Sequence, residues 1–342
     1  MRKSSIVVLA LVLMLLIGFF GTTFLLKNKL DEKMDLVLTY SNKFNYEPFI
    51  VAVEKGYFID ENLNITTMVV SGGIQSAEAI ITGSADVGAM GDAPAIILLD
   101  RNPSARILCR YSGGEGLHRY IAQDYITQPK DLEGRKVGIQ MGSSTHGSFL
   151  QWMKKNDVNM SKVTLVPMNP SDMPNAMNTK QIDAMAGSEP WPTNVERLCG
   201  GSVHQIGDSS GLGNTFPLLF MASGKALEEK PEAIKAAMRA LQRAIDFINQ
   251  NYNESVDICS RKIGLSIEDT RRSMQKQFFA IGFDDTDLQS LEQTAEFLLE
   301  NGRISAIPEF TSRLSPNICL NDKPRNSIIM EGVILSKDER DS

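Results

Sequence analysis

Three short segments rich in glycine and in small hydroxyl side chains follow strand-like runs and could bind an anion. They are residues 71–76 (SGGIQS), 91–95 (GDAPA) and 140–147 (QMGSSTHG). Each precedes a helix-like segment, and the free N–H groups and the dipole at a helix N-terminus attract negative charge. Each could also be a plain turn with a capping residue. Because open α/β sheets bind ligands at the carboxyl ends of their strands, the three together predict one shared pocket.

Motifs for catalysis and for metal binding are missing from the sequence. Residues 142–146 (GSSTH) fail the G-x-S-x-G pattern because His146 occupies the last glycine position. No P-loop or dinucleotide fingerprint is found. The cysteines lack a C-x-x-C pair, so no zinc site is expected; an oxidising compartment would permit disulfides, but buried thiols fit equally well. The four cysteines are Cys109, Cys199, Cys259 and Cys319.

Strand-like and helix-like segments alternate along the first two thirds of the chain. This rhythm predicts parallel sheets covered by helices. The strand-like runs lie at 35–41, 64–71, 85–90, 105–111, 136–140, 163–168 and 183–187. The helix-like segments lie at 46–56, 74–82, 92–99, 145–156 and 190–198.

The last third of the chain is predicted to be mostly helical. Apolar residues recur from Ile234 to Ile248 at spacings of three and four, which is one face of a long helix, and Pro231 suits its first turn. Leu288 to Leu298 repeat the pattern before Asn301 and Gly302 end it. Residues 316–342 are polar and break the helical pattern, which predicts a solvated extension.

The N-terminus predicts an extracytoplasmic location. Residues 6–26 carry no charge and are mostly Leu, Val, Ile and Phe. A transmembrane helix takes about 20 such residues, whereas the apolar part of a signal peptide is usually about 7–15. We therefore expect an uncleaved signal anchor that leaves the rest outside the cell membrane. A cleaved signal peptide, with a periplasmic or secreted product, is the alternative.

Charge argues against nucleic acid as a partner. The whole chain carries −6, and residues 1–30 hold four basic and no acidic residues, so the remainder carries −10. A nucleic-acid groove requires a basic surface, and no basic run is present. The length after the N-terminal segment exceeds what one core usually takes, which predicts two lobes.

Several motifs resemble the solute-binding proteins of ABC importers for nitrate, sulfonates and taurine. The similarity to the aliphatic sulfonate-binding members runs in order from about residue 35 to 310. The segments that carry it are 46–58 (YEPFIVAVEKGYF), 77–88 (AEAIITGSADVG), 91–94 (GDAP), 131–138 (DLEGRKVG), 142–146 (GSSTH), 181–184 (QIDA) and 189–192 (EPWP).

The resemblance implies an α/β periplasmic-binding-protein fold of type II, in which two lobes close on a ligand. It implies an N-terminal segment at 1–33, a first lobe at 34–120 and 212–315, a second lobe at 121–211 and an extension at 316–342. It also implies an ABC permease and its ATPase as partners, a monomeric binding protein, no cofactor and no chemistry on the ligand.

The resemblance also implies which residues hold an oxyanion through helix N-terminal amides and small hydroxyls. Tyr46 and Trp191 could form apolar walls, or could simply be core aromatics. An acidic side chain facing the pocket, Asp92 or Glu189, would favour a ligand that also carries an amine, such as taurine, over bare nitrate; Asp92 could instead be a helix cap. The predicted contacts are Asn45, Tyr46, Gly72, Gly73, Gln75, Gly91, Asp92, Ser143, Ser144, Thr145, His146, Glu189 and Trp191.

Other functions remain open at this point. A binding protein for a thiamine pyrimidine or another aromatic precursor would need stacking aromatics on both sides of the cleft. A membrane-anchored sensor would need a signalling module, and only about five residues precede residues 6–26. The pyrimidine synthases that share this fold carry a cluster of cysteines, whereas the cysteines here are isolated. Nitrate and bicarbonate stay possible as ligands.

Overall fold

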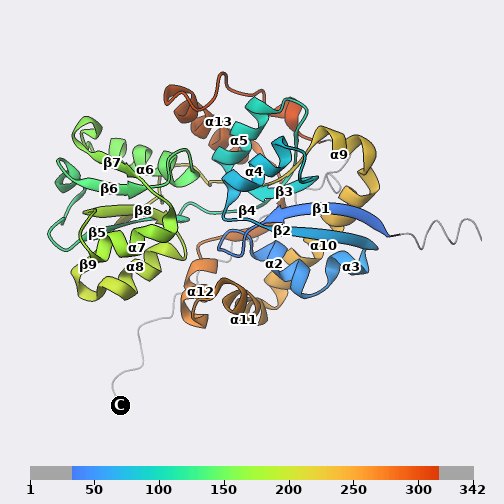
Figure 1. The fold of residues 1–342 in the computed structure, drawn as a ribbon, viewed down its shortest axis with the longest axis horizontal. Helices are drawn as coiled ribbons and strands as arrows, with labels where there is room; N and C mark the ends of the chain where they lie inside the picture. Colours follow the sequence, from blue (N-terminus) through green and yellow to red (C-terminus); the bar gives the residue numbers. More distant parts are fainter. Residues whose placement is uncertain (1–32, 316–342) are drawn as a thin grey trace, which may run out of the picture.

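The computed structural model describes residues 33–315, which form two α/β lobes lying side by side (Figure 1). The expected membrane segment at 6–26, the extension at 316–342 and Cys319 lie outside the described residues. Within residues 33–315, no helix has both the length and the apolar character needed to cross a bilayer. The two-sheet α/β architecture confirms the predicted α/β class, but the prediction of parallel sheets was wrong, because each sheet also contains antiparallel pairs.

The first lobe is built on a six-stranded sheet with the order β11-β4-β10-β3-β1-β2. Strand β1 pairs in parallel with β2 and β3, whereas β10 runs antiparallel to β3 and β4. The strands are β1 (Met34–Tyr40), β2 (Leu63–Val69), β3 (Val87–Met90), β4 (Arg106–Gly113), β10 (Leu218–Ala222) and β11 (Phe278–Gly282).

Helices cover both faces of this sheet. One face packs on α2 (Glu47–Glu54), α10 (Pro231–Gln250) and α11 (Tyr252–Ile263). The other packs on α4 (Gly73–Ile81), α5 (Asp92–Arg101) and α13 (Asp285–Glu300). The long helix predicted from Pro231 is confirmed, and its apolar stripe is buried against the sheet. The remaining helices of this lobe are α3 (Tyr57–Asp60), α9 (Gly224–Glu229) and α12 (Ile267–Met274).

The second lobe is built on a five-stranded sheet with the order β7-β6-β8-β5-β9. Its helices α6 (Ser144–Lys155), α7 (Met173–Asn178) and α8 (Trp191–Cys199) enclose two apolar clusters, one on each face of the sheet. The strands are β5 (His118–Gln123), β6 (Lys136–Ile139), β7 (Thr164–Pro167), β8 (Ala184–Ser188) and β9 (Val203–Asp208).

The chain crosses between the lobes twice. It leaves the first sheet after Gly113 and returns to it at Leu218. The two crossings are hydrogen-bonded to each other, since the Gly114 N–H donates to the carbonyl of Thr215 at 2.7 Å. Two joined connections of this kind suit a hinge, because only a few backbone torsions separate the two sheets.

Candidate functional site

A cleft between the two lobes offers about 820 Å³ of space, part of it open solvent. Both lobes line it, and most of the residues predicted from the sequence meet there. Whether they contact a ligand stays a prediction. The predicted residues that line the cleft are Asn45, Tyr46, Gly72, Gly73, Gly91, Ser143, Ser144, Thr145, Glu189 and Trp191.

Four helices begin at this cleft, and α4 begins with an N-cap residue that has no side chain. The N-cap residues of α2, α4, α5 and α6 all line the cleft. In α5 and α6, side chains of Asp92 and Ser143 accept hydrogen bonds from first-turn N–H groups. The N-cap of α4 is Gly72, which has no side chain to do so. The first N–H groups of α4 are therefore suited to hold an anion.

Close packing of the two lobes depends on a glycine at the start of α5. A Cβ atom on Gly91 would lie 2.8 Å from Oγ of Ser144 in the other lobe. Such a contact is too short for carbon and oxygen, so a larger residue would force the hydroxyl of Ser144 to rotate away. The glycine thus permits the N-termini of α5 and α6 to approach across the cleft.

Lys43 supplies a positive charge to the cleft and was not predicted from the sequence. It lies in the loop between β1 and α2, and its Nζ donates to the carbonyl of Ser71, next to the start of α4. The same Nζ lies 5.4 Å from the ring centroid of Trp191 in the second lobe. Burial lowers the pKa of Lys43. Among residues 33–315 no carboxylate pairs with it.

His118 is the second cleft residue that the sequence did not single out. It is the first residue of β5, and its Nδ1 lies 2.9 Å from Oγ1 of Thr145. Its Nε2 is buried and has no hydrogen-bond partner within residues 33–315. The edge of Phe216 packs against the ring at a centroid distance of 4.9 Å. Burial lowers the pKa of His118 to about 3, so the imidazole is neutral at physiological pH.

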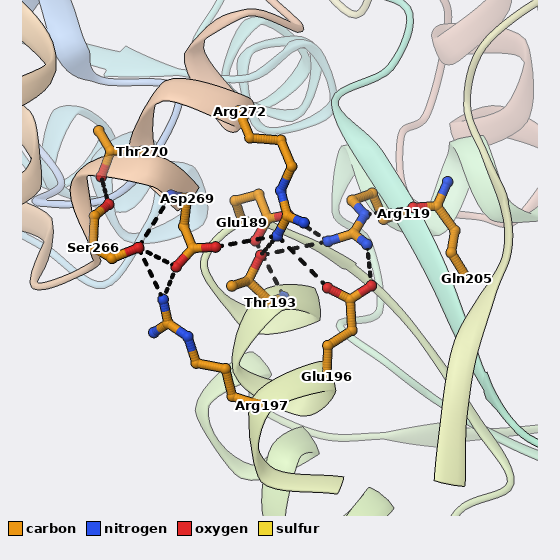
Figure 2. Close-up of polar contacts among 10 residues, drawn as sticks. All are labelled: Arg119, Glu189, Thr193, Glu196, Arg197, Gln205, Ser266, Asp269, Thr270 and Arg272. Atoms are coloured by element: carbon orange, nitrogen blue, oxygen red, sulfur yellow. Dashed lines mark hydrogen bonds and ion pairs between the residues drawn. The ribbon is translucent and has the colours of Figure 1, made fainter. Parts of the chain in front are cut away.

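Glu189 lines the cleft, but its charge is compensated within the second lobe. Figure 2 shows Arg119 between Glu189 and Glu196, with its guanidinium hydrogen-bonded to both carboxylates. The Nη1–Oε1 distance to Glu189 is 2.7 Å, and both side chains are 6% exposed. The other carboxylate oxygen of Glu189 accepts from the N–H of Thr193 at 3.2 Å. Glu189 therefore has no oxygen left without a partner for a ligand amine.

The same charge network joins the lobes outside the cleft. Arg272 of α12 donates to Thr193 of α8 at 3.0 Å and lies 3.7 Å from Glu196. Arg197 of α8 pairs with Asp269 of α12 (Figure 2). Helix α8 carries Thr193, Glu196 and Arg197, and Trp191 is the first residue of the same helix. The network therefore begins one helical turn from the cleft residues Trp191 and Glu189. These contacts stabilise the relative placement of the two lobes.

Three predicted contact residues do not line the cleft. Asp92 is fully buried, where its Oδ2 accepts from Oγ1 of Thr294 at 2.6 Å and its Oδ1 accepts from the Ala93 N–H at 2.8 Å. His146 packs against Phe297 of α13 and accepts from the Gly142 N–H. Gln75 follows the glycines of α4 but is not among the residues that line the cleft.

The hydroxyl–imidazole pair of Thr145 and His118 lacks the chemistry of a nucleophile and its base. A general base works best with a pKa near the operating pH, and burial holds the pKa of His118 near 3. No carboxylate within residues 33–315 hydrogen-bonds its second nitrogen. The described residues also contain no cluster of His, Cys, Asp or Glu that could hold a metal ion. The geometry suits binding.

Comparison with known proteins agrees with a binding site. The family model described as NMT1/THI5 like matches residues 43–255, more than half of the chain. The chain belongs to the NMT1/THI5-like family. A Brucella abortus protein whose name assigns it only a binding role is 30% identical over 212 residues, 62% of this chain. That stretch spans 66% of the relative, just under two thirds of its length.

Two further proteins that resemble this chain carry names that refer to sulfonates. An Escherichia coli K12 protein named for binding aliphatic sulfonates is 23% identical over 206 residues, covering 56% of this chain and 60% of its own. The solved alkanesulfonate-binding protein SsuA from Xanthomonas axonopodis pv. citri, bound to MOPS, superposes with a TM-score of 0.73. It is 18% identical and covers 83% of this chain and 99% of its own, so it shows a shared fold. The family resemblance predicted from the motifs is confirmed.

Proposed function

We propose that the chain is the extracytoplasmic solute-binding component of an ABC importer and captures a small organic oxyanion in the interlobe cleft. A sulfonate is the ligand class that fits best. The lobes close on the ligand and present it to a permease and its ATPase. The chain acts as a monomer, does no chemistry on the ligand and binds no nucleic acid, and residues 6–26 anchor it to the membrane.

One observation carries the proposal: the cleft satisfies its own negative charge and leaves its positive charge available. Both oxygens of Glu189 are engaged by Arg119 and Thr193, whereas Lys43 has only a carbonyl and an aromatic ring as partners within the described residues. A ligand anion would pair with the ammonium and with the uncapped N-terminus of α4. The names of the E. coli and Xanthomonas relatives support a sulfonate.

The same contacts argue against a ligand that needs an acidic partner. The amine of taurine would require a free carboxylate, but Glu189 is paired and Asp92 lies outside the cleft lining. The cleft also presents apolar surface from Phe44, Phe216 and Leu218. Of the anionic and zwitterionic ligands expected from the sequence, an alkyl sulfonate without an amine therefore fits better than taurine.

An aromatic precursor is the second candidate, and one observation favours it. Aromatic side chains line the cleft from both lobes, with Phe44 and Tyr46 on one side and Trp191 on the other. A stacking ligand would compete with Lys43, which lies over the Trp191 ring. Stacking on Trp191 would therefore displace a cation–π contact worth about 0.5–1 kcal/mol at an exposed site.

A thermal-shift panel tests the proposed function on the full chain. The ligands are 1-propanesulfonate, taurine, nitrate, bicarbonate and a hydroxymethylpyrimidine, each at several concentrations. We expect 1-propanesulfonate to raise the melting temperature most, because a ligand that binds only the folded state stabilises it by about 2.7 kcal/mol at one hundred times Kd. A shift with the pyrimidine alone would favour the second candidate, and no shift with any anion would overturn the proposal.

A further inference from the structure

We propose that His118 is a specificity-determining residue of the cleft: as a neutral imidazole it donates a hydrogen bond from Nε2 to an oxygen of the bound oxyanion. Thr145 is the positioning residue that sets this tautomer. The inference rests on the proposed function for its ligand and adds to it a donor that carries no charge.

The hydrogen bond between Thr145 and His118 is compatible with two tautomers of the imidazole. Within residues 33–315, the only partner of the Thr145 hydroxyl is Nδ1 of His118, at 2.9 Å. If the hydroxyl donates to Nδ1, the ring proton sits on Nε2, and that N–H is the donor left without a partner. If Nδ1 instead donates to the hydroxyl, both the hydroxyl proton and the Nε2 lone pair lack partners. In the arrangement we propose the hydroxyl donates, because only that one presents an N–H rather than a lone pair at Nε2 to an anion.

The surroundings of the imidazole ring leave Nε2 without a protein partner within residues 33–315, so it can bond a ligand. His118 is 4% exposed and lines the cleft, and Nε2 has no protein partner among the described residues. Phe216 packs edge-on against the ring and restricts its rotation. The backbone N–H of His118 donates to Oγ of Ser209, and its carbonyl accepts from the Ser209 N–H at 3.0 Å. These backbone bonds fix the start of β5 beside the second interlobe crossing.

Neutrality gives the donor a distinct role beside Lys43. Burial lowers the pKa of His118 to about 3, so the ring carries one proton over the physiological pH range. This N–H can donate a hydrogen bond but cannot accept one. A protonated oxyanion, or a hydroxyl that had to donate at this position, would therefore bind less well. The pair thus selects a fully ionised acceptor such as a sulfonate.

Calorimetric titration of full-length variants with 1-propanesulfonate tests the role of Nε2. His118→Gln places an amide N–H near the position of Nε2 and should keep the affinity within about threefold of wild type, whereas His118→Leu should weaken it about tenfold or more. His146→Asn is the matched control, because His146 is also buried but packs on Phe297 outside the cleft. A His118→Leu protein that binds as tightly as wild type overturns the inference.

Nitrogen-15 NMR of the imidazoles tests the tautomer without any ligand. At pH 7 we expect His118 in the neutral form protonated at Nε2, with His118→Gln used to assign its signals. Thr145→Val should produce a mixture of tautomers, and Thr145→Ser should restore the single form. A ring protonated at Nδ1, or on both nitrogens, contradicts the inference. If the wild-type protein binds no anion, both the proposed function and the inference fail. If the wild type binds 1-propanesulfonate and His118→Leu binds it equally tightly, only the inference fails.

Discussion

The two charged regions of the cleft differ in how far the protein satisfies them. On one side, the carboxylate of Glu189 is held by Arg119 and by the N–H of Thr193. In the first lobe, Lys43 has no carboxylate partner within the described residues, and Nε2 of His118, on the strand beside Ser188, has no hydrogen-bond partner there. The cleft therefore compensates the charge of its carboxylate and leaves its ammonium without a carboxylate partner among the described residues. This asymmetry, rather than the net charge of the chain, indicates an anionic ligand.

The largest expected effect comes from removing the carboxylate of Glu189, which Arg119 and Thr193 compensate. Glu189→Ala would leave Arg119 buried with only Glu196 as a carboxylate partner, and removing one partner of a buried ion pair costs about 3 kcal/mol or more. Urea unfolding measures the change. Glu232→Ala is the control, because its pair with Lys235 is exposed and should contribute less than about 1 kcal/mol. An equal loss of unfolding free energy in the two variants would mean that the buried pair of Arg119 and Glu189 contributes no more to stability than an exposed pair.

The open side should affect affinity rather than folding. Lys43→Met removes the only cleft ammonium without a carboxylate partner among the described residues, and a hydrogen bond to a charged group is worth about 2 kcal/mol, or roughly 30-fold in Kd. Calorimetry with 1-propanesulfonate measures it, and the exposed Lys225→Met serves as the control. An unchanged Kd in Lys43→Met would remove the ammonium from the binding site.

A third test concerns the carboxyl of Glu47, whose charge no residue of the two cleft regions compensates. Burial raises the pKa of Glu47 to about 7, and the hydrogen bond from Gln277 only partly opposes this shift. Between pH 4.5 and 7 the folded state then binds more protons than the unfolded state. The contribution of Glu47 to the free energy of unfolding is therefore full below pH 4.5 and is lost as the pH rises through 7.

Glu47→Gln should abolish that pH dependence. Relative to wild type, the variant should gain roughly 1 to 2 kcal/mol of unfolding free energy between pH 5.5 and pH 8. Urea unfolding at the two pH values measures this difference, which does not depend on any pH-independent cost of the substitution. Parallel pH profiles for the two proteins would show that Glu47 titrates normally.

The smallest expected effect concerns the buried carboxylate of Asp92. Thr294→Val removes the hydroxyl that donates to Oδ2 of Asp92, which should cost about 1 kcal/mol of stability while leaving sulfonate affinity unchanged. Thr294→Ser keeps the hydroxyl and should behave as wild type. A large loss of affinity in Thr294→Val would place Asp92 in the site after all.

The helix starts of the cleft could be predicted from sequence because their signals are local. Glycine and hydroxyl residues between a strand-like run and a helix-like run indicate a helix N-terminus, and Gly72, Gly91 and Ser143 are N-cap residues in the structure. The orientation of individual side chains could not be predicted in this way. His146 turns to Phe297 of α13, a partner that lies 151 positions away in the chain and leaves no local pattern.

The strands that the sequence analysis missed show the same limit. Strand β5 is buried throughout although it contains His118, Arg119 and Gln123, so it lacks an apolar pattern. These residues are tolerated because distant groups satisfy them: Arg119 bonds Glu189 and Gln205, and Gln123 donates to the carbonyl of Met177 at 2.7 Å. Strands β9, β10 and β11 were missed as well, and all three pair with distant strands. Only the folded arrangement brings these partners together.

One comparison of ligands tests the central claim most directly. 1-Propanesulfonate and taurine have nearly the same size and differ in a methyl group against an ammonium. Calorimetric titration of the wild-type chain should give a tighter Kd for 1-propanesulfonate, by about tenfold, because the ammonium would be desolvated without a carboxylate to receive it. Tighter binding of taurine would contradict the account, since it would require a free acceptor that the compensated Glu189 does not provide.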